Sequence, residues 1–176
     1  MIKPDEIKKI YTKNVDDNFK FRMFLKNRAD TSKLDQQFRD LHNELFIRNK
    51  YDCCKCANCC KLYDIQIAQK EISAISEYIG ETEDGFVEKF LIPDNEENEA
   101  FIVNQKPCSF LEADGKCRIY TVRPLVCRDF PNTKKPDRLF SLLGIISYTE
   151  DCPVVFEIIE RLKRIYGFRN KHSYGD

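Results

Sequence analysis

The sequence predicts a small, mainly helical α+β domain with one short β-hairpin. Three observations support this fold class. Apolar residues recur at helical spacing in several segments, one Asp-Gly dipeptide separates two short cysteine-bearing segments, and eight of the nine cysteines fall into two groups. The 176 residues are enough for one compact core, so the cysteines are not needed merely to hold a small fold together.

The first 49 residues are expected to form a helical extension ahead of the cysteines. Four apolar residues recur at spacings of four, three and four, which places them on one helix face: Leu34, Phe38, Leu41 and Leu45. Ser32, with Asp35 three positions on, predicts the N-cap, and we expect a helix from about Ser32 to Lys50. His42 lies on this helix as a packing or surface residue, because a lone histidine among amphipathic positions is seldom a ligand.

The segment between the two cysteine groups predicts two helices and a strand. Residues 65–79 are helical in pattern mainly towards their end, where isoleucines form a stripe before Gly80: Ile72, Ile75 and Ile79. Thr82 is the predicted cap of a second short helix, which Pro93 ends and whose apolar side is Phe86, Phe90 and Leu91. Residues 100–103 predict a short strand.

The remaining elements are the hairpin and a C-terminal helix. Residues 108–120 predict a hairpin that turns at Asp114-Gly115, a dipeptide that accepts positive φ, so that cysteines on its two arms face one another. A helix is expected from Pro153 to Tyr166 with Gly167 as its stop, and its inward face is Val155, Ile158, Ile159, Leu162 and Ile165. This helix begins beside Cys152, where its dipole favours a thiolate.

The cysteine spacing predicts a metal centre around which the domain is organised. Cys53, Cys56 and Cys59 follow at i, i+3 and i+6, which lets one turning loop point several sulfurs at one ion. Thiolates are soft ligands that favour zinc, copper(I) or iron–sulfur clusters. Because the chain has only two histidines, sulfur must dominate any such site.

Three other interpretations of the cysteines are less favoured. Inert burial is a poor explanation for five sulfurs within eight residues, since the polar Lys55 and Asn58 interrupt them. Disulfides are disfavoured by the odd cysteine count and by a start that lacks the apolar region of a secretory signal, which together favour a cytoplasmic, reducing setting. A redox dithiol normally stands alone beside a βαβ unit, and that pattern is absent here.

The spacing leaves two metals open. The run Cys53-x2-Cys56-x2-Cys59 has the spacing of three ligands in a bacterial ferredoxin, and Cys152 precedes a proline as the fourth ferredoxin cysteine does. The adjacent Cys60 and the missing continuation of the run depart from that pattern, so zinc is a close alternative to an iron–sulfur cluster or iron. Eight sulfurs would serve two four-coordinate sites, one larger cluster, or one site with spare cysteines.

Charge limits the partners. With 29 basic and 29 acidic residues, we expect no nucleic-acid partner, and no stretch approaches about 18 apolar residues, so we expect no membrane span. Basic residues gather around Cys117 and Cys127, and their arginines would offset the negative charge of a thiolate cluster and lower the thiol pKa values. The alternative is an ordinary solvated basic face.

The motifs resemble those of the CxxCxxCC cysteine-cluster family, a zinc- or iron-chelating domain. The likeness covers about residues 50–155 and rests on Cys53 to Cys60, Cys108-Ser-Phe-Leu, the long motif from Cys117 to Pro131, and Cys152-Pro153. It implies cysteine-ligated metal at eight positions: Cys53, Cys56, Cys59, Cys60, Cys108, Cys117, Cys127 and Cys152. Cys54 is an extra cysteine, and Ala57 stands where family members often have glycine.

These patterns lead to a set of expectations. Residues 1–49 are a helical extension that could bind a protein partner, 50–155 the metal-binding domain, and 156–176 a C-terminal helix packing on that domain. Beside the cofactor we place Arg118, Arg123, Arg128 and Tyr120, with Tyr120 and Phe110 shielding the sulfurs from water. The centre is structural or electron-carrying. The alternative is an iron–sulfur enzyme that modifies a protein, methyltransferase-like or redox, because flagellin lysine N-methylases contain a similar domain.

Overall fold

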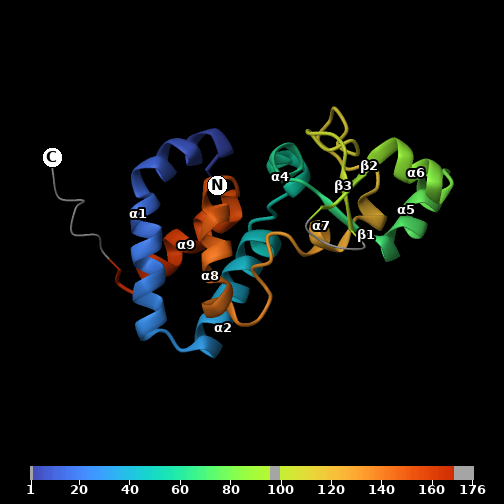
Figure 1. Cartoon of the computed structure of the whole chain (residues 1–176). Helices are drawn as coiled ribbons and strands as arrows, with labels where there is room; N and C mark the ends of the chain where they lie inside the picture. The colour runs from blue at the N-terminus through green and yellow to red at the C-terminus, as the bar shows by residue number, and fades with distance from the viewer. Residues whose placement is uncertain (1, 96–99, 169–176) are drawn as a thin grey trace. The chain divides into compact units, whose positions relative to one another are not determined.

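The computed structural model describes residues 2–95 and 100–168, and the chain divides into two compact units (Figure 1). We call Asp52–Phe130 the cysteine unit, and Met1–Tyr51 together with Pro131–Asp176 the helical unit. Helices predominate and one small antiparallel sheet is present, which confirms the predicted mainly helical α+β class. The predicted division at residues 49/50 and 155/156 remains a prediction.

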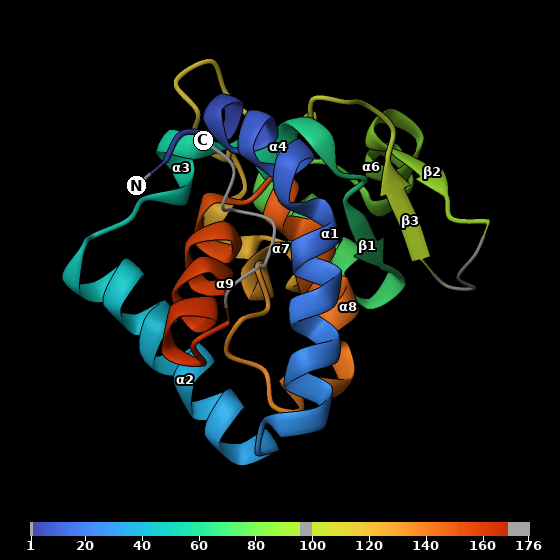
Figure 2. The same cartoon turned by 90° about the vertical axis from the view of Figure 1, so that its left-hand side faces the viewer.

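The helical unit consists of four main helices, α1 (Pro4–Arg28), α2 (Thr31–Asn43), α8 (Arg138–Ser147) and α9 (Pro153–Ile165). Both α1 and α2 contact α8 and α9, and Figure 2 shows α1 and α9 side by side. Their contacts enclose large apolar side chains with no exposed surface: Phe21, Leu25, Phe38, Ile158 and Leu162. Burial of these stripes, more than helix propensity, stabilises such helices.

The start of α2 differs from the prediction. Asp30, not Ser32, is the N-cap, because the Lys33 amide donates to Asp30 Oδ1 at 2.8 Å. The predicted partner Asp35 instead caps another helix: its two carboxylate oxygens accept hydrogen bonds from the Asp137 and Arg138 amides at 2.8 Å each, at the beginning of α8. The predicted apolar stripe of α2 is confirmed, since all four of its residues are buried: Leu34, Phe38, Leu41 and Leu45.

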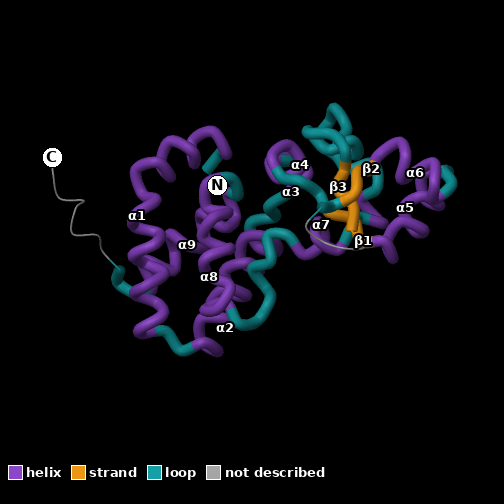
Figure 3. The backbone as a smooth tube through the Cα atoms, viewed as in Figure 1, coloured by secondary structure: helices purple, strands orange, loops and turns teal. Residues whose placement is uncertain are grey.

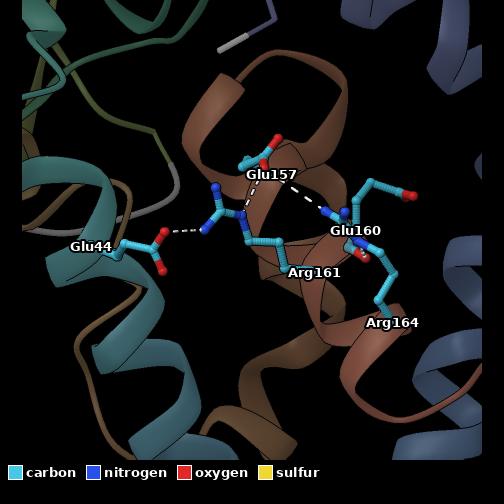
Figure 4. Close-up of polar contacts among 5 residues, drawn as sticks. All are labelled: Glu44, Glu157, Glu160, Arg161 and Arg164. Atoms are coloured by element: carbon cyan, nitrogen blue, oxygen red, sulfur yellow. Dashed lines mark hydrogen bonds and ion pairs between the residues drawn. The ribbon is translucent and has the colours of Figure 1, made fainter. Parts of the chain in front are cut away.

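An ion-pair network joins the π-helix Glu44–Arg48, which follows α2, to α9. Figure 4 shows Arg161 between two carboxylates, with Nη1 2.7 Å from Glu44 Oε1 and Nε 2.7 Å from Glu157 Oε1. All three side chains are partly exposed, so each pair contributes at most about 1 kcal/mol. The network therefore contributes little to the stability of the unit.

The C-terminal helix is confirmed with its stop. α9 begins at Pro153, ends at Ile165 and is followed by Gly167 at φ 62°. Four of the five predicted inward residues are buried, whereas Ile165 is wrong, because it lies in the last turn and is 54% exposed.

No single helix of the described residues is long and apolar enough to cross a membrane; the pair Arg138–Glu150 and Pro153–Ile165, bent by 120°, passes only when its lengths and compositions are combined.

The cysteine unit contains a three-stranded antiparallel sheet of order β1-β3-β2, drawn in orange in Figure 3. The strands are β1 (Gln66–Ala68), β2 (Leu91–Pro93) and β3 (Ala100–Val103), and the predicted strand at 100–103 is confirmed. Leu91 and Pro93, which we assigned to the end of a helix, belong to β2 instead. Pro93 is tolerated because β2 is an edge strand.

Two helices beside this sheet agree with their predicted caps. α5 (Ile72–Ile79) ends at Gly80 with φ 79°, and α6 (Glu83–Phe90) begins at Thr82, whose Oγ1 accepts from the Gly85 amide at 3.1 Å. They contact each other, and α6 contacts β2. Their apolar sides build the core of the unit around Phe86, together with Ile67, Ile72, Ile75, Val103, Phe110 and Ile119.

The predicted hairpin at 108–120 is present only as a tight loop. Its pairing is one antiparallel bridge between Leu111 and Cys117, and Gly115 turns the chain with φ 85°. The arms stop there because the chain enters a 3-10 turn at Tyr120–Val122 instead of a second strand. The turn was therefore predicted correctly, but the unit's strands lie elsewhere.

Candidate metal centre

The first cysteine group lies on two single-turn helices, α3 (Cys53–Cys56) and α4 (Asn58–Leu62). Asp52 caps α3, since its Oδ1 accepts from the Cys54 amide at 2.9 Å. Ala57 joins the two turns in the left-handed conformation, φ 49° and ψ 18°. This conformation costs a non-glycine residue about 1 kcal/mol, and it turns the chain sharply between the sulfurs of α3 and those of α4.

Backbone contacts bring the second cysteine group to the first. The Cys108 amide donates to the Cys60 carbonyl oxygen at 2.8 Å. Gly115, two residues before Cys117, lies against α3 so closely that a Cβ built on it would be 2.6 Å from the Cys54 carbonyl oxygen. Cys108 and Cys117 also pack against the core of the unit.

The third segment, α7 (Leu125–Asp129), carries Cys127 and is fixed by Glu71. The Leu125 amide donates to Glu71 Oε1 at 2.8 Å, and the Arg128 guanidinium lies 3.7 Å from the same oxygen. The other carboxylate oxygen accepts from the Ala68 amide at 3.1 Å. Glu71 therefore ties the Cys127 helix to the sheet. Sequence reasoning missed this residue, because its partner amide is 54 positions away.

The thiols of the three segments interact electrostatically. The Cys59 and Cys60 sulfurs are 4.0 Å apart, and a hydrogen bond from Cys59 is the main cause that lowers the pKa of Cys60 to about 7. Burial, with a smaller contribution from the charges of neighbouring cysteines, raises the pKa of Cys108 to about 11 and that of Cys127 to about 12. Near neutral pH the group thus offers one readily formed thiolate and several protonated thiols.

The charge of Arg123 acts on several of these sulfurs. Its Nε donates to the Tyr120 carbonyl oxygen at 3.0 Å, and its guanidinium lies 3.7 Å from the centre of the Tyr120 ring. Its positive charge adds to the lowering of the Cys60 pKa, and it opposes part of the rise that burial causes in the pKa values of Cys54, Cys117 and Cys127. Tyr120 is itself 48% exposed, so its clearest role is to hold Arg123.

The other residues placed beside the cofactor have different contacts. The Arg118 guanidinium lies 5.6 Å and 5.7 Å from the ring centres of Phe90 and Phe110, and Arg128 pairs with Glu71. Phe110 is 2% exposed in the core against which Cys108, Cys117 and Cys127 pack, a position that keeps water from one side of these sulfurs.

The predicted ligands divide between the two units. Seven lie in the cysteine unit, whereas Cys152 is a buried residue of the helical unit at the N-cap of α9. Within the cysteine unit Cys53 is exposed, and the other six are half-buried. The first and last of the eight predicted ligands therefore differ in exposure, since Cys53 is exposed and Cys152 is buried.

The donor set fits a soft metal ion. It consists of sulfur atoms that are partly removed from water, with one lowered pKa among them and a guanidinium to balance charge. Among the described residues, no three His, Cys, Asp or Glu side chains are already close enough to hold an ion. The sulfurs would therefore have to converge when they bind it.

Comparison with known families agrees with this donor set. The family model CxxCxxCC, described as "Putative zinc- or iron-chelating domain", matches residues 52–153, more than half of the chain and all nine cysteines. The chain belongs to the CxxCxxCC family. The matched region comprises the whole cysteine unit and continues through α8 to Pro153, so the CxxCxxCC domain draws on both units. Neither the search of curated proteins nor that of solved structures gave a match.

Proposed function

We propose that this CxxCxxCC protein holds a thiolate-ligated metal centre with a structural or electron-carrying role in the reducing cytosol. The observation that carries the proposal is that thiols of three chain segments act electrostatically on one another: Cys60 of the first, Cys108 and Cys117 of the second, and Cys127 of the third. The charge of Arg123, which acts on these thiols, also supports the proposal, because several thiolates on one ion leave net negative charge.

The proposed ligands are the eight cysteines of the family pattern: Cys53, Cys56, Cys59, Cys60, Cys108, Cys117, Cys127 and Cys152. Cys60 is the natural first ligand, because its low pKa makes it the easiest thiol to deprotonate. The more deeply buried Cys108 and Cys127 would release their protons only as the ion binds. Arg123 then offsets part of the charge that remains.

For the metal itself we propose iron, as an iron–sulfur cluster, with zinc as the alternative. The run Cys53-x2-Cys56-x2-Cys59 supports iron–sulfur, since three ligands of bacterial ferredoxins share that spacing. The family description names both iron and zinc. When bound, an iron–sulfur cluster would supply one-electron transfer, whereas zinc closed by four cysteines would supply structural cross-linking.

Anaerobic purification with elemental analysis tests both parts of the proposal. Iron–sulfur protein should be coloured, absorb near about 400 nm and contain stoichiometric iron and sulfide. Colourless protein with about one or two zinc ions would refute the iron preference and keep the metal centre. The double variant Cys59→Ser/Cys127→Ser should lose the metal, and Lys55→Ser, an exposed change in the same region, should keep it. Wild-type protein without any bound metal would refute the proposal.

A further inference from the structure

The cysteine outside the family pattern, Cys54, is half-buried, whereas its neighbour Cys53 is exposed. Consecutive residues of a helical turn project about 100° apart, so the two side chains of α3 point in different directions. The Asp52 cap fixes this turn through the Cys54 amide at 2.9 Å, which makes the difference a property of the local fold.

Contacts of the backbone place Cys54 against the loop that carries Cys117. The close approach of Gly115 is made to the carbonyl oxygen of Cys54 itself. Two residues after Gly115, the chain reaches Cys117 in its bridge with Leu111. Cys54 therefore lies where the first cysteine segment meets the second.

Electrostatics agree with this placement. The charge of Cys60 acts on both Cys54 and Cys117, and the charge of Cys54 acts on Cys117. Two cations also act on or respond to Cys54: burial raises the pKa of Cys54, the charge of Arg123 opposes part of that rise, and the charge of Cys54 adds to the raised pKa of Lys116. Asp52 accepts a hydrogen bond from the Cys54 thiol, and after burial its charge is the next cause that raises the pKa of Cys54. A metal ion among Cys54, Cys60 and Cys117 would remove the repulsion between thiolates at these positions.

We propose that Cys54 is a further thiolate ligand of the metal centre. The cysteine unit then carries eight sulfur donors of its own, enough for two four-coordinate sites without a ligand from the helical unit: Cys53, Cys54, Cys56, Cys59, Cys60, Cys108, Cys117 and Cys127. On binding, the thiol releases its proton to solvent and the sulfur donates a lone pair to the ion, with no change of oxidation state. The inference rests on the proposed metal centre.

Alkylation of the full-length chain tests the proposal without any substitution. The reduced protein is loaded with zinc alone or stripped with a chelator, pulsed with iodoacetamide and digested with trypsin. Cleavage after Lys50 and Lys55 releases Tyr51–Lys55, whose only cysteines are Cys53 and Cys54, and fragmentation separates their labels. Zinc should slow alkylation of Cys54 by about tenfold or more, since a coordinated thiolate is not a free nucleophile.

The outcomes separate this inference from the function on which it rests. Zinc that protects Cys60 and Cys127 but leaves Cys54 as reactive as in the stripped chain overturns the role of Cys54 alone. Zinc that protects no cysteine overturns the metal centre as well.

A variant provides an independent measurement. Cys54→Ser should weaken zinc binding in a chelator competition by about tenfold or more, whereas Lys55→Ser, the next residue in α3, should bind as the wild type does. Circular dichroism of both variants checks that the fold is intact. Wild-type zinc affinity in folded Cys54→Ser would contradict the proposal.

Discussion

The close approach of Gly115 to α3 predicts how much an alanine at this position would destabilise the fold. Two other glycines, Gly80 and Gly144, serve as controls. Gly115 has φ 85° and would place a Cβ 2.6 Å from the Cys54 carbonyl oxygen. Gly80 has a similar φ of 79° but open space around it, and Gly144 in α8 has open space with ordinary helical backbone. A Cβ at Gly115 would therefore meet both a steric clash and an unfavourable backbone conformation. A Cβ at Gly80 would meet the unfavourable backbone conformation alone, and a Cβ at Gly144 would meet neither.

The magnitudes follow from these differences. Gly80→Ala should destabilise the fold by about 1 kcal/mol, because the left-handed conformation penalises a Cβ. Gly115→Ala adds a clash with the Cys54 carbonyl oxygen, and because this is a backbone atom, the backbone itself must shift to relieve the clash. We expect the two effects together to lower the free energy of unfolding by about 2–4 kcal/mol. Gly144→Ala should stabilise α8 by about 0.5–1 kcal/mol, since alanine has the higher helix propensity.

Urea unfolding of the metal-free chain, followed by circular dichroism, measures all three changes in the free energy of unfolding. Chelator competition then tests the site, where Gly115→Ala should weaken zinc binding and Gly80→Ala should not. The reasoning is refuted if Gly115→Ala costs no more than Gly80→Ala, because the contact with Cys54 would then carry no energy.

Three further predictions concern single side chains. Glu71→Ala should lower the free energy of unfolding by about 1–3 kcal/mol and speed the loss of zinc, because it removes the acceptor of the Leu125 amide that fixes α7. Zinc release at the wild-type rate would contradict the positioning role of Glu71. Asp35→Ala should cost about 1–3 kcal/mol in urea unfolding, since it leaves the first two amides of α8 without their acceptor, and Ser32→Ala, at the disproved cap position, should cost little. Burial, followed by the charge of Lys134, lowers the pKa of His42 from 6.5 to about 4, so the folded state favours neutral His42. Neutral His42 therefore contributes about 1–3 kcal/mol to the free energy of unfolding above pH about 6.5, and this contribution is lost as the pH falls towards 4. His42→Gln should flatten this dependence, and an unchanged slope between pH 7 and 4.5 would show that another group causes it.

Local signals in the sequence predicted those elements whose causes are local. The Thr82 cap, the Gly80 stop, the strand at 100–103 and the start of α9 at Pro153 each depend on neighbours within a few residues. The Ser32 cap was wrong because Asp30, two residues earlier, caps α2 instead. The role of Asp35 could not be predicted, since its partners at the start of α8 lie about a hundred residues further along the chain.

The candidate site shows the same limit. Spacing and family motif pointed to the cysteines and to Arg123, whose charge does act on the thiols. They could not tell that Arg118 stacks on aromatic rings or that Arg128 pairs with Glu71, because these contacts depend on how sheet and loops pack. β1 escaped notice as well, since three residues are too few to show an alternating pattern.

The order of the chain through its two units has a consequence for biosynthesis. Residues 52–130 interrupt the helical unit, so α1 and α2 are made first and their partners α8 and α9 only after the whole cysteine unit. At about 5–20 residues per second, the ribosome needs about 4–16 s to translate that interval. Every sulfur of the cysteine unit therefore leaves the ribosome before the helical unit can close. Loading with metal can begin on the nascent chain, while α1 and α2 still await the helices that will bury them.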